Sequence, residues 1–343
     1  MEDILQNQLI VGGVTANQGE TKWGPATQVE LRDGTQVSLP VIVVNGAEEG
    51  PTLVITAATH PTEVIGIETV RRITRELIDP KKLNGRVIAF PVANPLGYQF
   101  GTYTSPHDGL NLSVSYPGNS KGQMTSRFAN FIWENAAKKA DLCIDFHENI
   151  KPCLSFIMVG AAADQETEKR AVDSAKAFGL TIIRKSADSA WELPGKKKTD
   201  LSYSATCMAN KIPAFTPELQ NSTEQAFRED EASIQVGVRG ILNVMKHLKM
   251  IPGKIEEQSG VKVLHGNFEA RTMISTERGG KVHRLVETGV KLKKGTPVAK
   301  VYNVYGNIVE TVEMPEDGYI WGWHVKEFTC QTGSNIAFYF VDV

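Results

Sequence analysis

Short apolar runs alternate with segments of helical periodicity along the middle of the chain, from about residue 50 to residue 250. The runs are rich in Val, Ile, Leu and Ala, which is typical of strands buried on both faces. They cover residues 52–58, 142–146 and 212–216. The helical segments, in which apolar residues recur every three or four positions, cover residues 64–77, 126–139, 163–178 and 231–248. This alternation predicts an α/β domain with a doubly wound sheet.

The two ends of the chain have a different pattern. Residues 1–48 hold alternating apolar and polar positions, as in 27–31 and 36–40, which predict leading strands. After the Pro-Gly pair at 252–253, short strand-like runs are separated by glycine turns. We therefore expect a larger domain over residues 1–255, with residues 1–48 as its leading strands, and a small all-β domain over residues 256–343.

Two stretches inside the larger domain show little periodicity. They are residues 101–122 and residues 188–200, the second of which contains a run of three lysines. A long irregular segment inside a compact domain is usually functional or mobile, so either loop is a candidate for contact with a ligand. The lysine run itself is typical of a solvated loop.

Composition narrows the class of partner. The formal net charge is −2 over 343 residues, which gives no long-range attraction to nucleic acid or acidic membranes, so we expect a small-molecule substrate. No run approaches the roughly 20 apolar residues that span a bilayer, and the first residues lack a signal-peptide pattern, so we expect a cytoplasmic protein. Four widely spaced cysteines, three of them in apolar or mixed segments, are typical of buried thiols.

Four dispersed polar residues carry the candidate chemistry. His60 and Glu63 follow the first apolar run and precede the first helical segment, His147 follows the second run, and Glu218 follows the third. Three residues of separation at the start of a helix place His60 and Glu63 on one face, within reach of one cation. In a mainly parallel sheet the strand ends meet at one crevice, which brings all four together.

Two imidazoles and one carboxylate are the ligand type of hydrolytic zinc, with a fourth position left for water. The competing interpretations are ordinary: a His and a Glu three residues apart are common, and Glu218 after Pro217 is also a typical turn acid. A serine-hydrolase pattern at residues 118–122, Gly-Asn-Ser-Lys-Gly, lacks the preceding buried strand that a nucleophilic serine requires.

Several short segments, in their order and spacing, carry a resemblance to a known family. They are Gly50 to Thr52, Thr59 to Glu63, Gly66 to Glu68, Pro91 to Pro95, Asp108 to Leu112, Tyr116 to Gly118, Asp145 to His147 and Pro213 to Glu218. Through them the chain resembles the succinylglutamate desuccinylase/aspartoacylase family of zinc carboxypeptidase-like hydrolases, over nearly its whole length.

The resemblance implies a zinc-carboxypeptidase-like mixed sheet followed by a C-terminal all-β, lipoyl-like barrel. It implies that His60, Glu63 and His147 hold one Zn²⁺ per chain and that Glu218 is the general base of a metal-activated water, later passing a proton to the leaving nitrogen. The β domain lacks a lipoyl-type hairpin with a modifiable lysine. Its expected role is to shield one edge of the site or to form the contact of a homo-oligomer.

The chain also departs from the family pattern. Pro61-Thr62 stands where the family has Gly-Asp, which leaves both flanking ligands in place. Ser113-Val114 stands where the family has Asn-Arg, and valine cannot pair with a carboxylate. A second family arginine is missing from residues 101–107. A substrate carboxylate in the usual place is therefore disfavoured.

Other groups must then contact the substrate. The candidates in the loop before the first long helix are Tyr103, His107, Asp108 and Asn111. Arg184 and Lys185 are candidates from a second loop.

These observations favour a zinc-dependent deacylase that cleaves the amide bond of an N-acylated small molecule. Two alternatives stay open. One is a metallo-carboxypeptidase that acts on a short peptide, and the other is a non-catalytic metal- or ligand-binding homologue, which the missing arginines favour.

Overall fold

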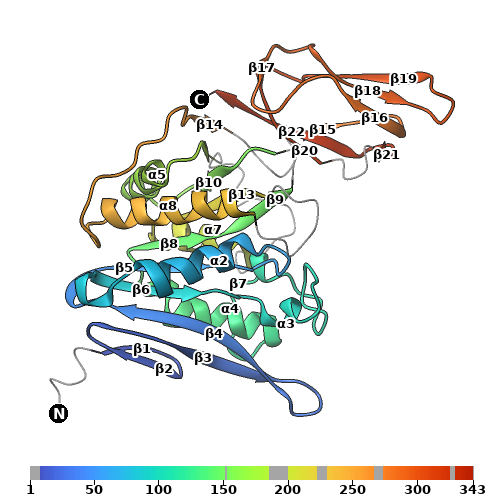
Figure 1. Cartoon of the computed structure of the whole chain (residues 1–343). Coiled ribbons are helices and arrows are strands. Elements are labelled where there is room, and N and C mark those ends of the chain that lie inside the picture. The colour runs from blue at the N-terminus through green and yellow to red at the C-terminus, as the bar shows by residue number, and fades with distance from the viewer. Residues whose placement is uncertain are drawn as a thin grey trace.

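A large mixed sheet forms the centre of the computed structural model, which describes residues 8–150, 153–184, 200–221, 230–265, 273–324 and 329–342 (Figure 1). Up to residue 221 the strands are β1 (Gln8–Val11), β2 (Val14–Asn17), β3 (Glu20–Glu30), β4 (Gln36–Asn45), β5 (Glu48–Thr56), β6 (Asn84–Phe90), β7 (Tyr116–Pro117), β8 (Leu142–Asp145), β9 (His147–Ile150), β10 (Phe156–Val159), β11 (Ile182–Arg184), β12 (Asp200–Leu201) and β13 (Ala214–Asn221). The later strands are β14 (Val263–His265), β15 (Met273–Ser275), β16 (Gly280–Arg284), β17 (Lys291–Leu292), β18 (Pro297–Tyr302), β19 (Ile308–Glu313), β20 (Gly318–Trp323), β21 (Thr329–Cys330) and β22 (Asn335–Asp342).

Within the described residues, the main sheet runs in the order β17-β20-β22-β14-β11-β10-β13-β8-β5-β6-β4-β3, with β9 beside β13 and β15 beside β22. Parallel pairs such as β5–β8 and β13–β8 lie at its centre, and antiparallel pairs such as β3–β4 lie toward its edges. The predicted α/β fold with a mixed sheet is confirmed.

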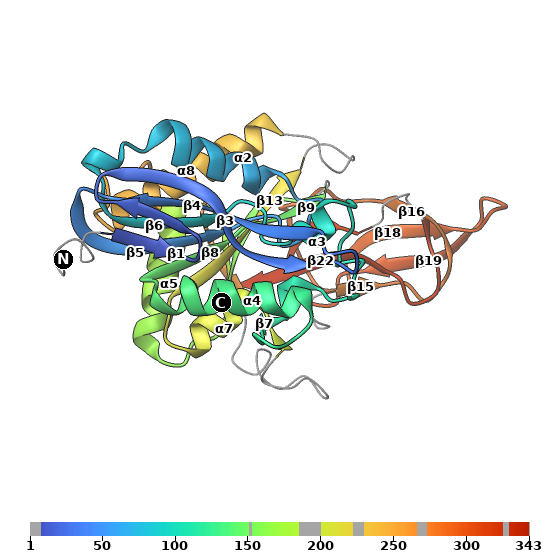
Figure 2. The ribbon, with the colours of Figure 1, turned by 90° about the horizontal axis from the view of Figure 1, so that it is seen from below.

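Helices cover both faces of this sheet. They are α2 (Ile65–Arg72), α3 (Pro95–Tyr98), α4 (Met124–Asn135), α5 (Gln165–Phe178), α7 (Tyr203–Ala209) and α8 (Glu231–His247). Figure 2 shows α2 and α8 on one face and α4 and α7 on the other. The central strands are therefore buried from both sides, as their apolar sequences require: Leu53, Ile55, Ile144 and Phe215 are fully buried.

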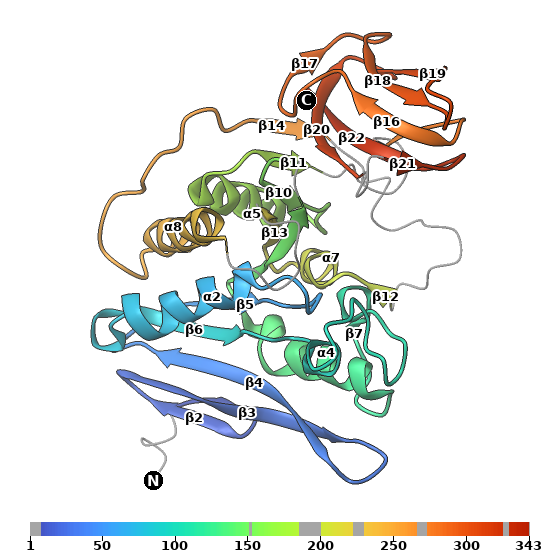
Figure 3. The same cartoon turned by 45° about the vertical axis from the view of Figure 1, so that its right-hand side comes forward.

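The C-terminal strands form an all-β region at the end of the molecule opposite β1–β4 (Figure 3). A four-stranded sheet of order β19-β18-β16-β21 packs over the end of the main sheet, and the two share a separate apolar core that includes Val298, Ile320 and Ile336.

The all-β region is joined to the rest by both backbone and side chains. Strand β14 pairs in parallel with β11 and in antiparallel with β22, so the main sheet continues across residue 255 without a break. Eight buried residues form what we call the junction cluster: Cys153, Phe156, Ile183, Leu264, Tyr319, Trp321, Phe338 and Phe340. The domain boundary at residues 255/256 therefore stays a prediction.

Most predicted elements appear with small shifts at their ends. The segment 64–77 contains α2 and then a π-helical turn, Ile73–Leu77. Cys143, Cys153 and Cys207 are buried free thiols, and Cys330 is half-buried. Among the described residues, no helix is both long and apolar enough to cross a membrane.

Candidate metal centre

His60 and Glu63 lie in a tight turn between β5 and α2. The chain leaves β5 through Ala58, whose φ of 47° is in the left-handed region that alanine adopts at a cost. The backbone N–H of Glu63 then donates to the carbonyl of His60 at 3.0 Å. Helix α2 begins only at Ile65, so the predicted helical spacing of the two ligands is instead a turn. The outcome is the same, because His60 Nδ1 lies 2.9 Å from Glu63 Oε1.

His147 and Glu218 are brought together by strand pairing. His147 opens β9, and its Cα partner on the parallel strand β13 is Glu218. The prediction that Glu218 lies beyond the end of its strand is wrong: β13 continues to Asn221, because its backbone pairs with β9 on one side and with β10 on the other, where Phe156 is the partner of Glu218.

Three side chains converge on one point. His147 Nδ1 lies 3.0 Å from Glu63 Oε2 and 3.1 Å from His60 Nδ1, and the three ligand atoms lie within 4.8 Å of one another. His60 and His147 are both only 6% exposed. The three side chains form a compact, nearly buried cluster that could hold a metal ion.

A buried carboxylate behind the cluster fixes the orientation of His147. Asp145 Oδ2 lies 3.0 Å from His147 Nε2, and its other oxygen accepts from the hydroxyls of Thr56 at 2.6 Å and Thr59 at 3.0 Å. Because a carboxylate only accepts hydrogen bonds, we assign the Nε2 proton to this contact. The neutral ring then presents a lone pair at Nδ1, the form that binds a metal.

The cluster needs positive charge at its centre. In the neutral state the Nδ1 lone pair of His147 faces the oxygens of Glu63, which is unfavourable unless a cation lies near both. Burial raises the pKa of Glu63, but the opposing effect of His147 and His60 is larger and brings the pKa down to about 2. Burial lowers the pKa of His147, but Asp145 and Glu63 raise it more, so it lies well above its ordinary value. With His147 neutral and Glu63 ionised, the two imidazoles and the carboxylate fit a divalent zinc ion.

Glu218 and Tyr103 border the same cluster. Glu218 is half-buried, and its Oε2 accepts from Asn149 Nδ2 at 2.6 Å. The Tyr103 ring stacks on His60 with centroids 3.8 Å apart and an angle of 18°. Burial raises the pKa of Tyr103, and the charges of Glu63 and Glu218 raise it further, while a hydrogen bond with Asn111 lowers it. The Tyr103 hydroxyl is therefore a neutral donor next to the candidate base.

The other predicted contacts are less central. His107 is exposed and packs edge-on against Phe100, with centroids 5.3 Å apart. Both oxygens of Asp108 accept hydrogen bonds: from the backbone and hydroxyl of Thr125 in the first turn of α4, at 2.8 and 2.9 Å, and from Leu110 N at 3.2 Å.

Of the two basic candidates from the second loop, Arg184 pairs with Glu168 of α5. Lys185 lies outside the described residues, as does nearly all of the loop 188–200.

Sequence reasoning missed the roles of Asp145 and Asn149. Both lie two residues from His147, and alternate residues of an extended chain share one face. That spacing is the signal that could have identified them as the partners of His147 and Glu218.

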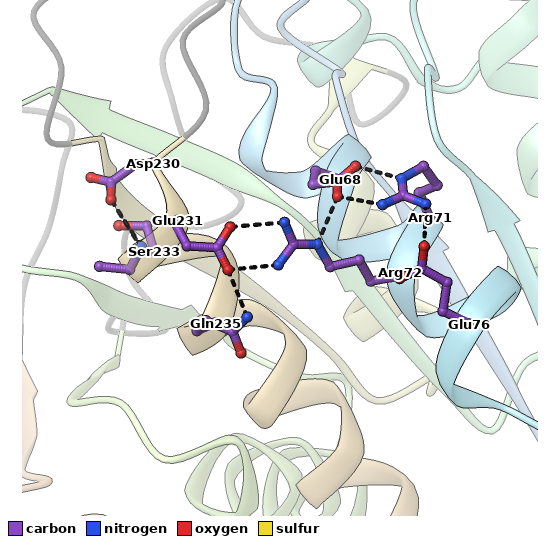
Figure 4. Close-up of polar contacts among 9 residues, drawn as sticks. Glu68, Arg71, Arg72, Glu76, Asp230, Glu231, Ser233 and Gln235 are labelled. Carbon is purple, nitrogen blue, oxygen red and sulfur yellow. Dashed lines mark hydrogen bonds and ion pairs between the residues drawn. The ribbon is translucent and has the colours of Figure 1, made fainter.

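Ion pairs hold α2, the helix that follows Glu63, against α8. The Arg72 guanidinium donates to both oxygens of Glu231 at 2.7 and 2.8 Å, and its Nε donates to Glu68 at 2.6 Å (Figure 4). Gln235 donates to Glu231 one turn further along α8. The bidentate Arg72–Glu231 contact restrains the position of α2, and of the His60–Glu63 turn before it, relative to α8.

Comparison with known proteins agrees with this arrangement. Residues 49–248 match the model of the succinylglutamate desuccinylase/aspartoacylase catalytic domain. The chain belongs to this family. Within it, a curated relative from Halomonas elongata, N-alpha-acetyl-L-2,4-diaminobutyric acid deacetylase, is 27% identical over 289 residues, which cover 81% of this chain and 78% of the relative.

Solved structures of the desuccinylase/aspartoacylase type share the fold. The product-bound ectoine utilization protein EutE (DoeB) from Ruegeria pomeroyi matches with a TM-score of 0.78 and 20% identity, over 94% of this chain and 95% of that one. A succinylglutamate desuccinylase/aspartoacylase from Rhodobacter sphaeroides matches with the same TM-score and coverage, at 21% identity. At these identities the likeness concerns the fold alone.

Proposed function

We propose that the chain is a zinc-dependent deacylase that hydrolyses the amide bond of an N-acylated small molecule. The observation that carries the proposal is the convergence of His60, Glu63 and His147 on one point, with Glu218 on the strand next to His147. The deacetylase activity named for the Halomonas elongata relative supports the choice of reaction. Nitrogen and oxygen ligands in this ratio favour zinc, one ion per chain.

The roles of the side chains follow from their contacts. Bound zinc would acidify a water molecule and polarise the scissile carbonyl. Glu218 accepts the proton of the attacking water and returns it to the leaving nitrogen. Asn149 holds one oxygen of Glu218 through its 2.6 Å hydrogen bond and so fixes the orientation of this carboxylate. Asp145 keeps His147 in the tautomer that offers Nδ1.

Substrate binding falls to the loop before α4. Tyr103 donates its hydroxyl proton toward developing charge on the carbonyl oxygen, since it stacks on His60 and its raised pKa keeps it neutral. Asn111 orients Tyr103 and contacts the substrate. His107 and Asp108 act at the rim of the site, with Asp108 also securing the start of α4.

The C-terminal all-β region is proposed to be a lipoyl-like barrel formed as its own domain from residue 256. Its two sheets pack on a core that is separate from the main one, which supports this assignment. Its role is to wall one edge of the site or to form a homo-oligomer contact.

The deciding experiment measures metal content and amide hydrolysis together. Wild-type protein should contain about one zinc per chain and hydrolyse members of a panel of N-acetyl amino acids and N-acetyl amines. His147→Ala should lose the zinc. Glu218→Gln should keep the zinc but lose at least about a hundredfold in kcat, because a general base contributes roughly 10²–10⁴-fold.

The controls separate the alternatives. Glu30→Gln changes an exposed carboxylate at the end of the edge strand β3 by the same chemistry and should keep both zinc and turnover. Zinc without turnover would instead support a ligand-binding homologue, and cleavage of peptides in preference to N-acetyl amines would support a carboxypeptidase. A protein without zinc would refute the proposal.

A further inference from the structure

A cavity of about 690 Å³ lies in the loop region before α4. It lies between the short 3₁₀ turn Leu112–Val114, the loop that follows β7, and the first turns of α4. The residues around it are Leu110, Asn111, Val114, Ser115, Gly118, Asn119, Ser120, Ser126 and Asn130. A volume of this size matches the clefts that hold small organic ligands.

None of the nine residues that line the cavity is ionisable. Six of them instead carry hydroxyl or amide groups, which both donate and accept hydrogen bonds. Some of these groups hold the loop itself: Asn111 Oδ1 accepts from Ser113 N, and Asn119 Oδ1 accepts from Lys121 N, each at 2.9 Å. The side chain of Asn130 has no hydrogen-bond partner among the described residues and is free to contact a ligand.

The charged residues closest in sequence to the wall, which are Asp108, Lys121 and Arg127, do not line the cavity. Asp108 is occupied by Thr125 and Leu110. Arg127 lies on α4 and donates its Nε to the carbonyl of Gly122 at 2.8 Å. An ionised group that entered the cavity would therefore find no ionisable side chain in its wall to compensate for lost hydration.

Asn111 connects this cavity to the metal cluster. It is part of the cavity wall, and its side chain lies close enough to the Tyr103 hydroxyl to lower the pKa of that group. The Tyr103 ring in turn stacks on His60. The Tyr103 side chain therefore links the cavity wall to a proposed zinc ligand, a span that a small substrate bound at the metal can match.

We propose that this cavity, called here the neutral pocket, binds an uncharged part of the substrate that bears hydroxyl or amide groups. The inference rests on the proposed deacylase function and adds the substrate class to it. The preferred substrates are N-acyl compounds with a neutral polar portion, and N-acyl amino acids with a free carboxylate are poor ones. Both polyols and amides share the required chemistry.

Matched substrates test this selectivity. N-acetyl-L-serinamide and N-acetyl-L-serine differ only in the charge of the carboxyl end, and N-acetyl-D-glucosamine supplies hydroxyls in place of the amide. We expect kcat/KM to be at least tenfold higher for serinamide or for glucosamine than for N-acetylserine. Whichever neutral substrate is faster identifies the source of the polar groups. Equal or faster cleavage of N-acetylserine would overturn the inference.

Two variants place the effect in the pocket. Asn130→Ala should lower kcat/KM for the faster neutral substrate by about tenfold and leave that of N-acetylmethylamine, which is too short to reach the pocket, unchanged. Val114→Arg should reverse the preference, because it adds a cation at an exposed wall position. Val304→Arg, at the exposed tip of the β18–β19 hairpin, should change neither value. No change in either pocket variant would overturn the inference.

A binding measurement separates this inference from the proposed function. Saturation-transfer NMR with N-acetyl-L-serinamide and with N-acetyl-D-glucosamine reports binding of these ligands to the protein whether or not hydrolysis takes place. Binding that Asn130→Ala weakens, in a protein without turnover, would support the neutral pocket and refute the deacylase. Turnover without discrimination between neutral and charged substrates would support the deacylase and refute the neutral pocket.

Discussion

Asp145→Asn provides a sharp test of the metal centre, because it changes one atom and reverses one hydrogen bond. In the wild type, Oδ1 of Asp145 accepts from Thr56 and Thr59, and Oδ2 accepts from His147 Nε2. Asparagine can keep its oxygen on the two threonines, but it then presents an N–H to His147 Nε2. Nε2 must become the acceptor, and the proton of the neutral ring moves to Nδ1, where it blocks the lone pair needed for a metal.

The expected magnitude follows from these contacts. Loss of such an outer partner typically lowers metal affinity by about 10–100-fold, or roughly 1.4–2.7 kcal/mol. The fold should survive, because two of the three hydrogen bonds persist and the protonated Nδ1 can donate to Glu63 Oε2, which lies 3.0 Å away. The variant should therefore unfold at nearly the same denaturant concentration as the metal-free wild type.

The assay is a competition titration of zinc against a chromophoric chelator, with stability measured separately on the metal-free proteins. Asp33→Asn is the matched control: it removes the same charge from an exposed turn, where the asparagine oxygen can still accept from Thr35 N. Thr59→Val removes one hydroxyl from Asp145 but keeps the tautomer, so it should weaken zinc binding less. Wild-type zinc affinity in a folded Asp145→Asn protein would refute the reasoning.

Three further predictions concern stability. The pKa of Glu231 is lowered from 4.5 to about 2 by its hydrogen bonds with Arg72 and Gln235, so the ionised carboxylate stabilises the fold above pH 4.5 and this stabilisation is lost as pH falls toward 2. The free energy of unfolding of Glu231→Gln in urea should therefore differ from that of the wild type at pH 7 and converge with it in acid. A difference that does not change with pH would contradict this origin. Phe340→Ala should cost about 3–5 kcal/mol of unfolding free energy in chemical denaturation, since Phe340 is fully buried in the junction cluster, whereas Tyr305→Ala at the exposed hairpin tip should stay within about 0.5 kcal/mol. Bound zinc should stabilise the folded wild type by about 2.7 kcal/mol when free zinc is a hundred times Kd, because binding is linked to folding. Removal of zinc by a chelator should therefore lower the melting temperature of the wild type and should not change that of His147→Ala.

The helices and central strands could be predicted because their signals are local. Helix α8 spans Glu231–His247, against a predicted 231–248, and α5 spans Gln165–Phe178, against a predicted 163–178. In both, one buried face imposes a periodicity that is visible in the sequence. Strand β13 was predicted too short, because its second half, Glu218–Asn221, is polar and is extended only through pairing with β9 and β10.

The candidate site shows the same division. Residue types and strand ends were enough to bring His60, Glu63 and His147 together, because each follows a buried apolar run of the sheet. The partners of these groups depend on contacts between distant segments. Asp108, for example, is a candidate substrate contact in sequence, and the fold also places it against the first turn of α4, 17 residues later. Nothing in the local sequence pattern predicts this hydrogen bond between Asp108 and the start of α4.

The unbroken sheet across the junction limits how the molecule can move. A hinge needs a few residues that can change their backbone torsions without breaking hydrogen bonds elsewhere. Here β11, β14, β22 and β20 form consecutive ladders, and Phe156 and Phe340 pack across them with centroids 5.5 Å apart. Swinging the all-β region would break these ladders and expose the aromatic rings. The all-β region is therefore held fixed against the rest of the molecule and does not swing as a lid domain.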